Sequence, residues 1–322
     1  MKRIGVLTSG GDSPGMNPAI RAVVRRAIYE GMEVVGIKRG FKGLIEGDFT
    51  EMDARSVSGI VNRGGTILLS SRSEKFKTLE GQKIAVENMK KWGIEGLVVI
   101  GGDGSYRGAY ALYKNWGIPT VGVPGTIDND LWGTDLTIGF DTAVNIALEA
   151  IDRIRDTATS HERLFIIEVM GRTSGFIALY AGVAGGAEDI LIPETPTHLD
   201  EIIKRLEEGK KKGKVSSILV VAEGEEEGGA LDIARKIRDK VGYETRVLIL
   251  GHLQRGGSPT AIDRILATRL GSAAVEILKE GKGGVAVGWV NNALKITPLP
   301  EAWEKKKPID ADLCELSLIM SI

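Results

Sequence analysis

The amino-acid sequence predicts an α/β fold made of two facing doubly wound domains with mostly parallel sheets. Short runs rich in β-branched residues alternate with helical patterns, and this alternation is typical of parallel sheets covered by helices on both faces. Six of the predicted strands also end in polar, glycine-rich turns. Because ligands of such sheets bind at the carboxyl ends of the strands, these turns are the first candidates for a binding site.

The first set of elements fills the N-terminal part of the chain. Its predicted strands are Ile4–Ser9, Glu33–Lys38, Leu97–Ile100 and Thr120–Val123, and its predicted helices are Asn17–Glu30, Gln82–Trp92 and Tyr106–Asn115. A second set begins near residue 140, with helices at Asp141–Thr157 and Leu199–Gly209 and strands at Leu164–Val169, Ser217–Ala222 and Val247–Leu250.

The composition limits the possible function classes. The chain has 322 residues, 43% of them hydrophobic and 26% charged, which is an ordinary balance for a soluble protein with one large or two smaller domains. A formal net charge of −1 gives no electrostatic reason to expect binding to nucleic acid or to a membrane. The single cysteine, Cys314, excludes an intramolecular disulfide and a cysteine-based zinc site. We therefore expect a cytoplasmic protein without signal peptide or membrane span.

Two of the strand-ending turns read Gly-Gly-Asp. Gly10-Gly11-Asp12 follows the first predicted strand, and Gly101-Gly102-Asp103 follows Leu97–Ile100. A glycine pair lets the backbone turn tightly and brings N–H groups close to anionic oxygens, above all those of phosphate. The neighbouring aspartate suits a hard cation such as Mg²⁺. The combination predicts an enzyme that handles phosphate.

A second candidate loop, Thr126-Ile127-Asp128-Asn129-Asp130, follows the strand Thr120–Val123. Its two carboxylates could be turn formers, but one carboxylate on Mg²⁺ and another that takes a proton from a hydroxyl are what phosphoryl transfer needs. Five arginines at or near strand ends could hold phosphate bidentately: Arg72, Arg163, Arg172, Arg246 and Arg255. His252 and Glu223, also at strand ends, can hydrogen-bond sugar hydroxyls.

Three other nucleotide-binding functions compete with the predicted phosphoryl transfer. No Walker A sequence occurs, which excludes a P-loop kinase. A Rossmann-type NAD-binding oxidoreductase remains an alternative, because Gly102-Asp103-Gly104 follows a strand and Asp128 follows the next. However, Arg107 stands where the third glycine belongs. A non-catalytic nucleotide sensor is the other alternative, although it would not need the loop around Asp128.

Nine segments together carry a resemblance to a known family: Leu7–Asn17, Arg63–Leu68, Gly96–Tyr106, Pro124–Asp130, Asp156–Arg163, Glu168–Arg172, Val220–Gly224, Glu244–Arg246 and Gly251–Pro259. In this order they closely resemble the bacterial ATP-dependent 6-phosphofructokinases. The resemblance implies that MgATP phosphorylates the 1-hydroxyl of fructose 6-phosphate, a regulated step of glycolysis. It also implies an ATP-binding larger domain at 1–138 and 251–304, and a smaller domain for the sugar phosphate at 139–250 and 305–322.

The resemblance assigns roles residue by residue. Asp128 is implied as the general base, Thr126 and Arg172 as groups that stabilise the transferring phosphoryl group, and Asp130 as a residue that shapes the loop. The implied ATP-binding residues are Gly11, Arg72, Ser73, Gly102, Asp103, Gly104 and Ser105, with Asp103 on Mg²⁺. The implied sugar-phosphate residues are Thr126, Ile127, Asp128, Met170, Gly171, Arg172, Glu223, His252, Leu253, Gln254 and Arg255.

The family also implies an assembly. Arg163 and Arg246 would reach the 6-phosphate from a neighbouring subunit, so a homotetramer is expected. An effector pocket for ADP or phosphoenolpyruvate is implied at Arg21, Arg25, Arg55, Arg155, Gly186, Glu188, Lys212 and Lys214. Without the family, the basic run around Lys212 and Lys214 would be interpreted as a solvated helix end.

Some positions depart from the family pattern or bear on the phosphoryl donor. Ala54, Val215 and Ser216 stand at positions where the family often has basic or polar residues, so the resemblance does not fix the strength of regulation. Pyrophosphate-dependent relatives carry Asp in place of Gly104 and Lys in place of Gly125. The two glycines therefore predict open space for the α-phosphate and ATP as the donor.

Overall fold

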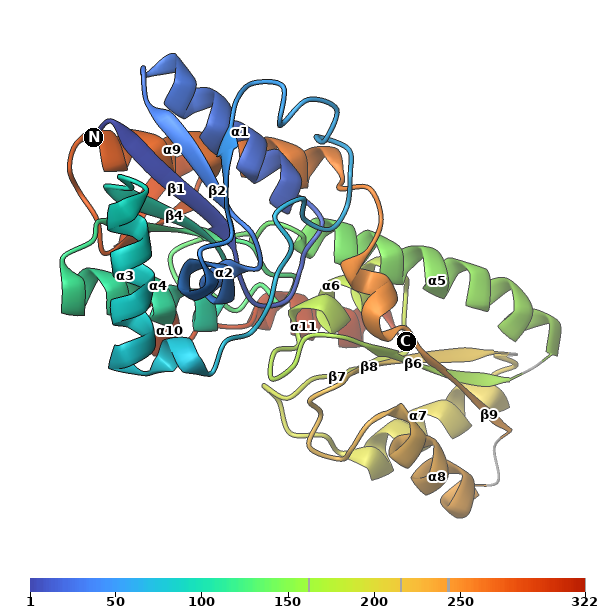
Figure 1. Cartoon of the computed structure of the whole chain (residues 1–322). Helices are drawn as coiled ribbons and strands as arrows, with labels where there is room; N and C mark the ends of the chain where they lie inside the picture. Colours follow the sequence, from blue (N-terminus) through green and yellow to red (C-terminus); the bar gives the residue numbers. More distant parts are fainter. Residues whose placement is uncertain (162, 215, 242–243, 322) are drawn as a thin grey trace. The chain divides into compact units, whose positions relative to one another are not determined.

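The computed structural model describes residues 1–161, 163–214, 216–241 and 244–321 (Figure 1). The chain divides into two compact units. The first unit comprises Met1–Ile127, Leu131–Thr142 and Arg255–Lys307, and the second comprises Asp128–Asp130, Ala143–Gln254 and Pro308–Ile322.

A seven-stranded sheet forms the centre of the first unit. Its strands occur in the order β11-β10-β5-β4-β1-β2-β3. β1, β2, β4, β5 and β10 are parallel, whereas β3 and β11 pair antiparallel at the two edges. The bounds are β1 Arg3–Thr8, β2 Glu33–Ile37, β3 Phe49–Met52, β4 Gly96–Gly101, β5 Thr120–Pro124, β10 Val285–Val290 and β11 Ala293–Pro298.

Helices cover both faces of this sheet. Val6 and Val98 point to one face, where they join a core with α1 and α9, while Leu7 and Val99 point to the other, towards α2, α3, α4 and α10. This alternation follows the two-residue period of strands, and residues buried on both faces explain why the strands read as continuous apolar runs. The helix bounds are α1 Met16–Tyr29, α2 Gly40–Glu46, α3 Leu79–Lys91, α4 Asp103–Trp116, α9 Ala261–Lys279 and α10 Leu299–Glu304, with a short 3₁₀ helix, η1, at Lys75–Lys77.

The second unit contains a four-stranded parallel sheet in the order β7-β8-β6-β9. Its strands are β6 Leu164–Val169, β7 Asp189–Leu191, β8 Ser217–Ala222 and β9 Thr245–Ile249. Ile166 and Leu219 pack with α7 (Leu199–Lys211) and α8 (Ala230–Val241) on one face. The other helices are α5 Phe140–His161, α6 Phe176–Ala184 and α11 Ala311–Met320, and the 3₁₀ helix η2 covers Gly251–Arg255.

The predicted fold class is confirmed: both sheets are mostly parallel and alternate with helices, as in a doubly wound α/β protein. The seven predicted strands and five predicted helices correspond to observed elements, with ends that differ by a few residues. One of these differences matters for the site. α4 begins at Asp103 and not at Tyr106, so the Gly-Gly-Asp turn runs straight into the helix.

Candidate active site

The two Gly-Gly-Asp loops lie next to each other at the carboxyl edge of the first unit's sheet. β1 and β4 are neighbours, and the chain proceeds from β1 to β2 on one side and from β4 to β5 on the other. Such a reversal of strand order is where doubly wound sheets bind ligands. Ser9 N donates to Ile100 O (3.0 Å), and Ser105 Oγ donates to Ser9 O (2.9 Å), so hydrogen bonds join the two loops.

Gly11 lies close to the end of an arginine side chain. Arg255 Nη1 donates to Asp12 O at 3.2 Å, and a Cβ at position 11 would lie 1.9 Å from the same nitrogen. Any side chain at position 11 would therefore displace the guanidinium. Arg255, which the family assigns to the sugar phosphate, belongs to the first unit and lies beside Gly11 and Asp12.

The start of α4 supplies a positive helix end. Gly102 is the N-cap residue, Asp103 occupies the first helical position, and Gly104 N donates to Asp103 Oδ1 (2.5 Å). A Cβ at Gly102 would lie 3.5 Å from Thr126 Cβ, which places the threonine beside this turn. The positive end of the helix dipole favours anions at this position.

Arg72 and Ser73 precede η1 in the same unit. Arg72 is exposed, and Ser73 Oγ accepts a hydrogen bond from Phe76 N (3.3 Å). Ser70 Oγ donates to Gly10 O (2.5 Å), so this segment is attached to the first Gly-Gly-Asp loop. The segment therefore brings an exposed cation to the same edge of the sheet.

Gly104 and Gly125, where pyrophosphate-dependent relatives carry larger residues, differ in the free space around them. A Cβ at Gly104 would meet no atom within 4 Å, whereas one at Gly125 would lie 2.8 Å from Ile100 Cγ2 and 3.2 Å from Met16 Cε. The expectation of open space is confirmed at Gly104. It is wrong at Gly125, because core side chains already fill the direction in which a side chain would extend.

Asp103 is the first unit's candidate for holding a metal ion. No group of three or more His, Cys, Asp or Glu residues suited to a metal occurs in the part of the chain that the structure describes. Asp103 offers a carboxylate with 42% of its side chain exposed. One such carboxylate fits Mg²⁺ that takes its other ligands from phosphates and water, since this ion keeps several waters and binds few protein groups.

The loop after β6 is the centre of the second unit's candidate site. Met170 N donates to Gln254 Oε1 (2.7 Å), and Arg172 N donates to Glu223 Oε1 (2.7 Å) at the end of β8. The structure thus brings together residues that follow three strands of this sheet. A Cβ at Gly224 would lie 1.8 Å from Arg172 O, so the two loops pack backbone to backbone.

The Asp128 loop is attached to this same region. Ser174 Oγ donates to Asp128 O (2.8 Å), and Ser174 N donates to Gly171 O (2.9 Å). Asp128 is buried, with 5% of its surface exposed, and it belongs with Asn129 and Asp130 to the second unit. Thr126 and Ile127 belong to the first unit, so the chain changes units between Ile127 and Asp128.

Arg163 and Arg246 lie at the opposite end of the second unit's sheet. Arg163 immediately precedes β6, Arg246 pairs in register with Phe165, and both guanidinium groups contact Glu244 Oε1 at 3.1 and 2.6 Å. Arg172 follows the other end of β6, about 20 Å away for a strand of this length. Within one chain, Arg163 and Arg246 are therefore at the opposite end of the sheet from the residues that follow β6, β8 and β9.

Comparison with known proteins identifies the family. The family model described as phosphofructokinase matches residues 3–278. The chain belongs to the phosphofructokinase family. An ATP-dependent 6-phosphofructokinase of Halalkalibacterium halodurans is 60% identical over 322 residues, and ATP-dependent 6-phosphofructokinase 1 of Thermus thermophilus is 59% identical; both matches cover the whole of each chain. The resemblance to bacterial ATP-dependent enzymes is confirmed.

Solved phosphofructokinases share the fold. The structure of phosphofructokinase from Saccharomyces cerevisiae aligns with a TM-score of 0.90 and 38% identity, covering 94% of this chain and 45% of the yeast chain. A pyrophosphate-dependent phosphofructokinase from Marinobacter aquaeolei aligns with a TM-score of 0.85 and 25% identity over 100% of this chain and 92% of its own. The fold is therefore shared with a relative that is named for pyrophosphate as its phosphoryl donor.

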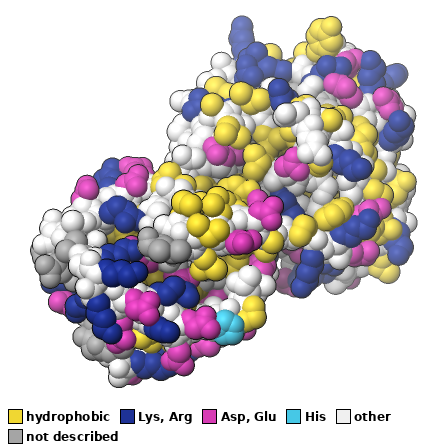
Figure 2. All heavy atoms as spheres, turned by 180° about the vertical axis from the view of Figure 1, so that it is seen from behind, with side chains coloured by type: hydrophobic (Ala, Val, Ile, Leu, Met, Phe, Trp, Pro, Cys, Tyr) yellow, Lys and Arg dark blue, Asp and Glu magenta, His cyan; other side chains and the backbone are white. Residues whose placement is uncertain are grey.

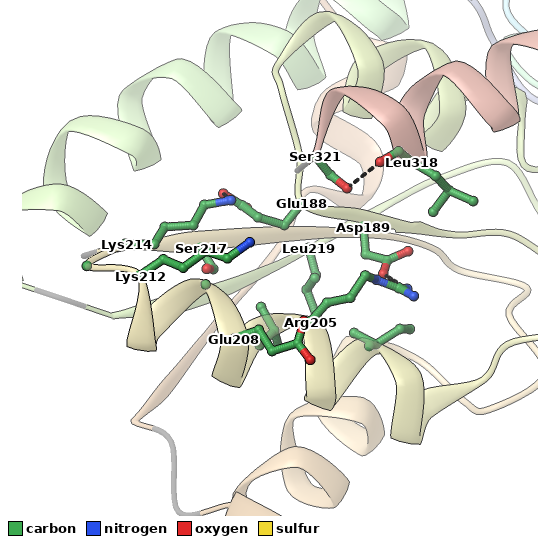
Figure 3. Close-up of a pocket in the computed structure, with 14 residues that line it drawn as sticks. Glu188, Asp189, Arg205, Glu208, Lys212, Lys214, Ser217, Leu219, Leu318 and Ser321 are labelled. Atoms are coloured by element: carbon green, nitrogen blue, oxygen red, sulfur yellow. Dashed lines mark hydrogen bonds and ion pairs between the residues drawn. The ribbon is translucent and has the colours of Figure 1, made fainter.

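Several residues that the phosphofructokinase resemblance assigns to an effector pocket come together in the second unit. Lys214 Nζ lies 3.1 Å from Glu188 Oε1, and Arg155 Nη2 donates to Gly186 O (2.7 Å). Glu188, Lys212 and Lys214 line a pocket of about 660 Å³ between α7 and the end of α11 (Figure 3). Arg21, Arg25 and Arg55 belong to the first unit, and Val215 lies outside the described residues.

Sequence reasoning missed a buried carboxylate beside the phosphofructokinase loops. Asp263 is 1% exposed and accepts hydrogen bonds from Gly139 N (2.8 Å), Thr142 N (2.9 Å) and Thr142 Oγ1 (2.5 Å). Burial raises its pKa to about 6. It precedes no glycine-rich turn and lies 121 positions from Thr142, so no local signal pointed to it.

The surface agrees with the small net charge. On the face shown in Figure 2, lysine and arginine side chains are interspersed with aspartate and glutamate. None of the helices in the described part of the chain has the length and apolar character needed to cross a membrane.

Proposed function

We propose that this chain transfers a phosphoryl group from ATP to the 1-hydroxyl of fructose 6-phosphate in the cytoplasm. The observation that carries the proposal is the pair of loops around Asp103 and Asp128, embedded in a sequence that is about 60% identical to relatives named ATP-dependent 6-phosphofructokinase. The first unit is proposed to bind ATP and the second to bind the sugar phosphate.

The nucleotide is assigned to the strand-order reversal of the first unit. Gly11, Gly102, Gly104 and Ser105 present backbone at the carboxyl edge, and the N-terminus of α4 favours the phosphates. The exposed Arg72 adds a cation, and the neighbouring Ser73 is also assigned to the nucleotide. Open space at Gly104 supports ATP over pyrophosphate as the donor.

Mg²⁺ is assigned to Asp103, whose carboxylate would share the ion with the nucleotide phosphates. Bound there, the ion would neutralise charge on the phosphate oxygens. Asp103 fits this role because its carboxylate is partly exposed at the N-terminus of α4, where the phosphates are proposed to bind.

The acceptor is assigned to the loops that follow β6, β8 and β9. Its proposed contacts in the second unit are Met170, Gly171, Arg172, Glu223, His252, Leu253 and Gln254. The family pattern also assigns Thr126, Ile127 and Arg255 to the sugar phosphate. In the proposed step, Asp128 takes the proton of the 1-hydroxyl while the new O–P bond forms and the bond to the leaving ADP breaks. Arg172 and Thr126 stabilise charge on the transferring group, and Asp130 shapes the loop.

The position of Arg163 and Arg246 supports a contribution from another copy of the chain. They lie at the far end of β6 from Arg172, so they are assigned to the 6-phosphate of a neighbouring subunit in a homotetramer. ADP and phosphoenolpyruvate are proposed as effectors at Arg155, Gly186, Glu188, Lys212 and Lys214. The family pattern also assigns Arg21, Arg25 and Arg55 to effector binding. The pocket beside α7, which Lys212 and Lys214 line, supports this assignment.

An initial-rate assay with fructose 6-phosphate, Mg²⁺ and either ATP or pyrophosphate tests the proposal. Formation of fructose 1,6-bisphosphate with ATP alone is expected. Turnover with pyrophosphate alone would overturn the donor assignment and keep the acceptor, and folded protein that is inactive with both donors would overturn the function. Adding ADP or phosphoenolpyruvate to the same assay tests the effector pocket.

A further inference from the structure

Arg107 is held by two contacts near the candidate metal ligand. It lies one turn beyond Asp103 in α4, and its Nε is 3.9 Å from Asp103 Oδ2. Its guanidinium carbon lies 5.0 Å from the ring centroid of Trp303 in α10. The Tyr110 ring packs edge-on against Trp303 at 5.8 Å, which fixes the indole from another direction.

These contacts orient the guanidinium towards Asp103. An exposed ion pair four residues apart on a helix contributes little by itself, partly because two mobile side chains must be ordered. Stacking on an aromatic ring removes much of the freedom of an arginine, and a lysine cannot reproduce the planar stack. The charge of Arg107 therefore stays close to Asp103 before any ligand arrives.

We propose that Arg107 is a positioning residue that balances the charge of Asp103 and so sets how strongly the site prefers metal-bound over metal-free nucleotide. The proposal rests on the proposed function, which assigns ATP to this helix end. A metal-free nucleoside triphosphate carries more negative charge than its magnesium complex, and the Asp103 carboxylate would repel it more strongly without the charge of Arg107. With Mg²⁺ present, the ion neutralises the same carboxylate and the contribution of Arg107 becomes small.

Calorimetric titration with a non-hydrolysable ATP analogue, in EDTA and in excess Mg²⁺, tests the proposal without turnover. Arg107→Gln is expected to weaken metal-free binding about three- to fivefold and magnesium-bound binding by less than about twofold. Trp303→Leu should act in the same direction with a smaller effect, and Arg107→Lys, which keeps the charge but not the planar stack, should recover only part of the loss. Arg153→Gln, which removes an exposed arginine paired four residues away with Glu149 in α5, is the matched control and should change neither value.

Equal weakening in both media would overturn the proposal, because it would indicate a direct nucleotide contact or a structural role. Unchanged metal-free binding in Arg107→Gln, or no measurable metal-free binding by the unmodified protein, would overturn it as well. Failure of the unmodified protein to bind the analogue in either medium would instead overturn the proposed function, and circular dichroism of each variant identifies loss of folding.

Discussion

At the scale of single residues, backbone strain coincides with the proposed acceptor site. Arg172 and Asn129 adopt left-handed backbone conformations, with φ of 55° and 53°. Such conformations are uncommon for residues other than glycine and persist where surrounding contacts enforce them. Here Glu223 holds Arg172 N and Ser174 holds Asp128 O, the carbonyl next to Asn129. The left-handed conformations thus occur at Arg172 itself and at the residue that follows Asp128.

Replacing Asp128 with asparagine tests its proposed role as base. Asp128→Asn keeps the size of the side chain but cannot accept the hydroxyl proton, so kcat should fall about 10²- to 10⁴-fold. Binding of both substrates, measured by calorimetry, should change little. A kcat close to that of the unmodified enzyme would contradict the assignment.

Asp263 predicts an unusual pH dependence of stability. Its pKa is raised from 3.8 to about 6 by burial, against the opposing effect of hydrogen bonds from Thr142 and Gly139. Because the folded state binds the proton more tightly than the unfolded state, the free energy of unfolding from this group falls as pH rises from about 4 to about 6. The total change is at most about 3 kcal/mol.

Asp263→Asn should remove this pH-dependent contribution. Urea unfolding of both proteins between pH 4.5 and 7 measures it, and the difference between their unfolding free energies should grow on the acidic side in favour of the unmodified protein. A difference that stays constant across this range would show that Asp263 does not titrate there.

At the scale of secondary-structure elements, most parallel strands were predictable, whereas β3, β7 and the β10–β11 hairpin were not. Apolar composition and a glycine-rich turn at the carboxyl end both indicate a strand, and both occur in β1, β4, β5, β6 and β8. β7 has three residues and presents too short a pattern. The β10–β11 hairpin does carry a local signal in the pair Asn291-Asn292. Both residues have positive φ (49° and 61°), as two-residue hairpin turns require.

In the candidate active site, too, features with a local sequence signal were predictable, and those formed by packing of distant segments were not. That the chain turns at Asp103 and before Asp128 was predictable, because glycine-rich segments follow the apolar strands β4 and β5. The stacking of Arg107 on Trp303 was not, since those residues are distant in the sequence and meet only through the packing of α10 on α4. Asp263 was missed for the same reason.

The contact between the loops after β6 and β8 predicts the effect of adding one methyl group. In Gly224→Ala the new Cβ would lie 1.8 Å from Arg172 O, so the loop must move. The KM for fructose 6-phosphate should rise and kcat should fall about tenfold or more, while the KM for ATP stays nearly unchanged.

Gly209→Ala is the matched control, because its Cβ would approach only the flexible Lys214 side chain, at 3.3 Å. Steady-state kinetics without effectors compares the two variants. An equal rise of both KM values in Gly224→Ala, or normal kinetics, would contradict the proposed place of the sugar phosphate.

At the scale of the whole molecule, the central question is whether the sugar-phosphate site of one chain needs Arg163 and Arg246 from another chain. Arg163→Ser should raise the KM for fructose 6-phosphate about 10- to 100-fold, because a charge-assisted phosphate contact is lost. The KM for ATP should change little. Arg235→Ser removes an exposed arginine of α8 that pairs with Asp232, and serves as control.

Mixed assemblies extend this prediction. When Asp128→Asn and Arg163→Ser subunits are dissociated and reassembled together, some sites combine Asp128 of one subunit with Arg163 of the other. Activity well above that of either variant alone is expected. Activity no higher than the average of the two would show that each chain uses its own arginine.

Product analysis by ³¹P nuclear magnetic resonance tests the proposed function most directly. The purified protein, given ATP, Mg²⁺ and fructose 6-phosphate, should produce one fructose 1,6-bisphosphate for each ADP, and Asp128→Asn should produce almost none while still binding both substrates. Release of inorganic phosphate without a bisphosphate product, or product formation by Asp128→Asn at the unmodified rate, would contradict the account.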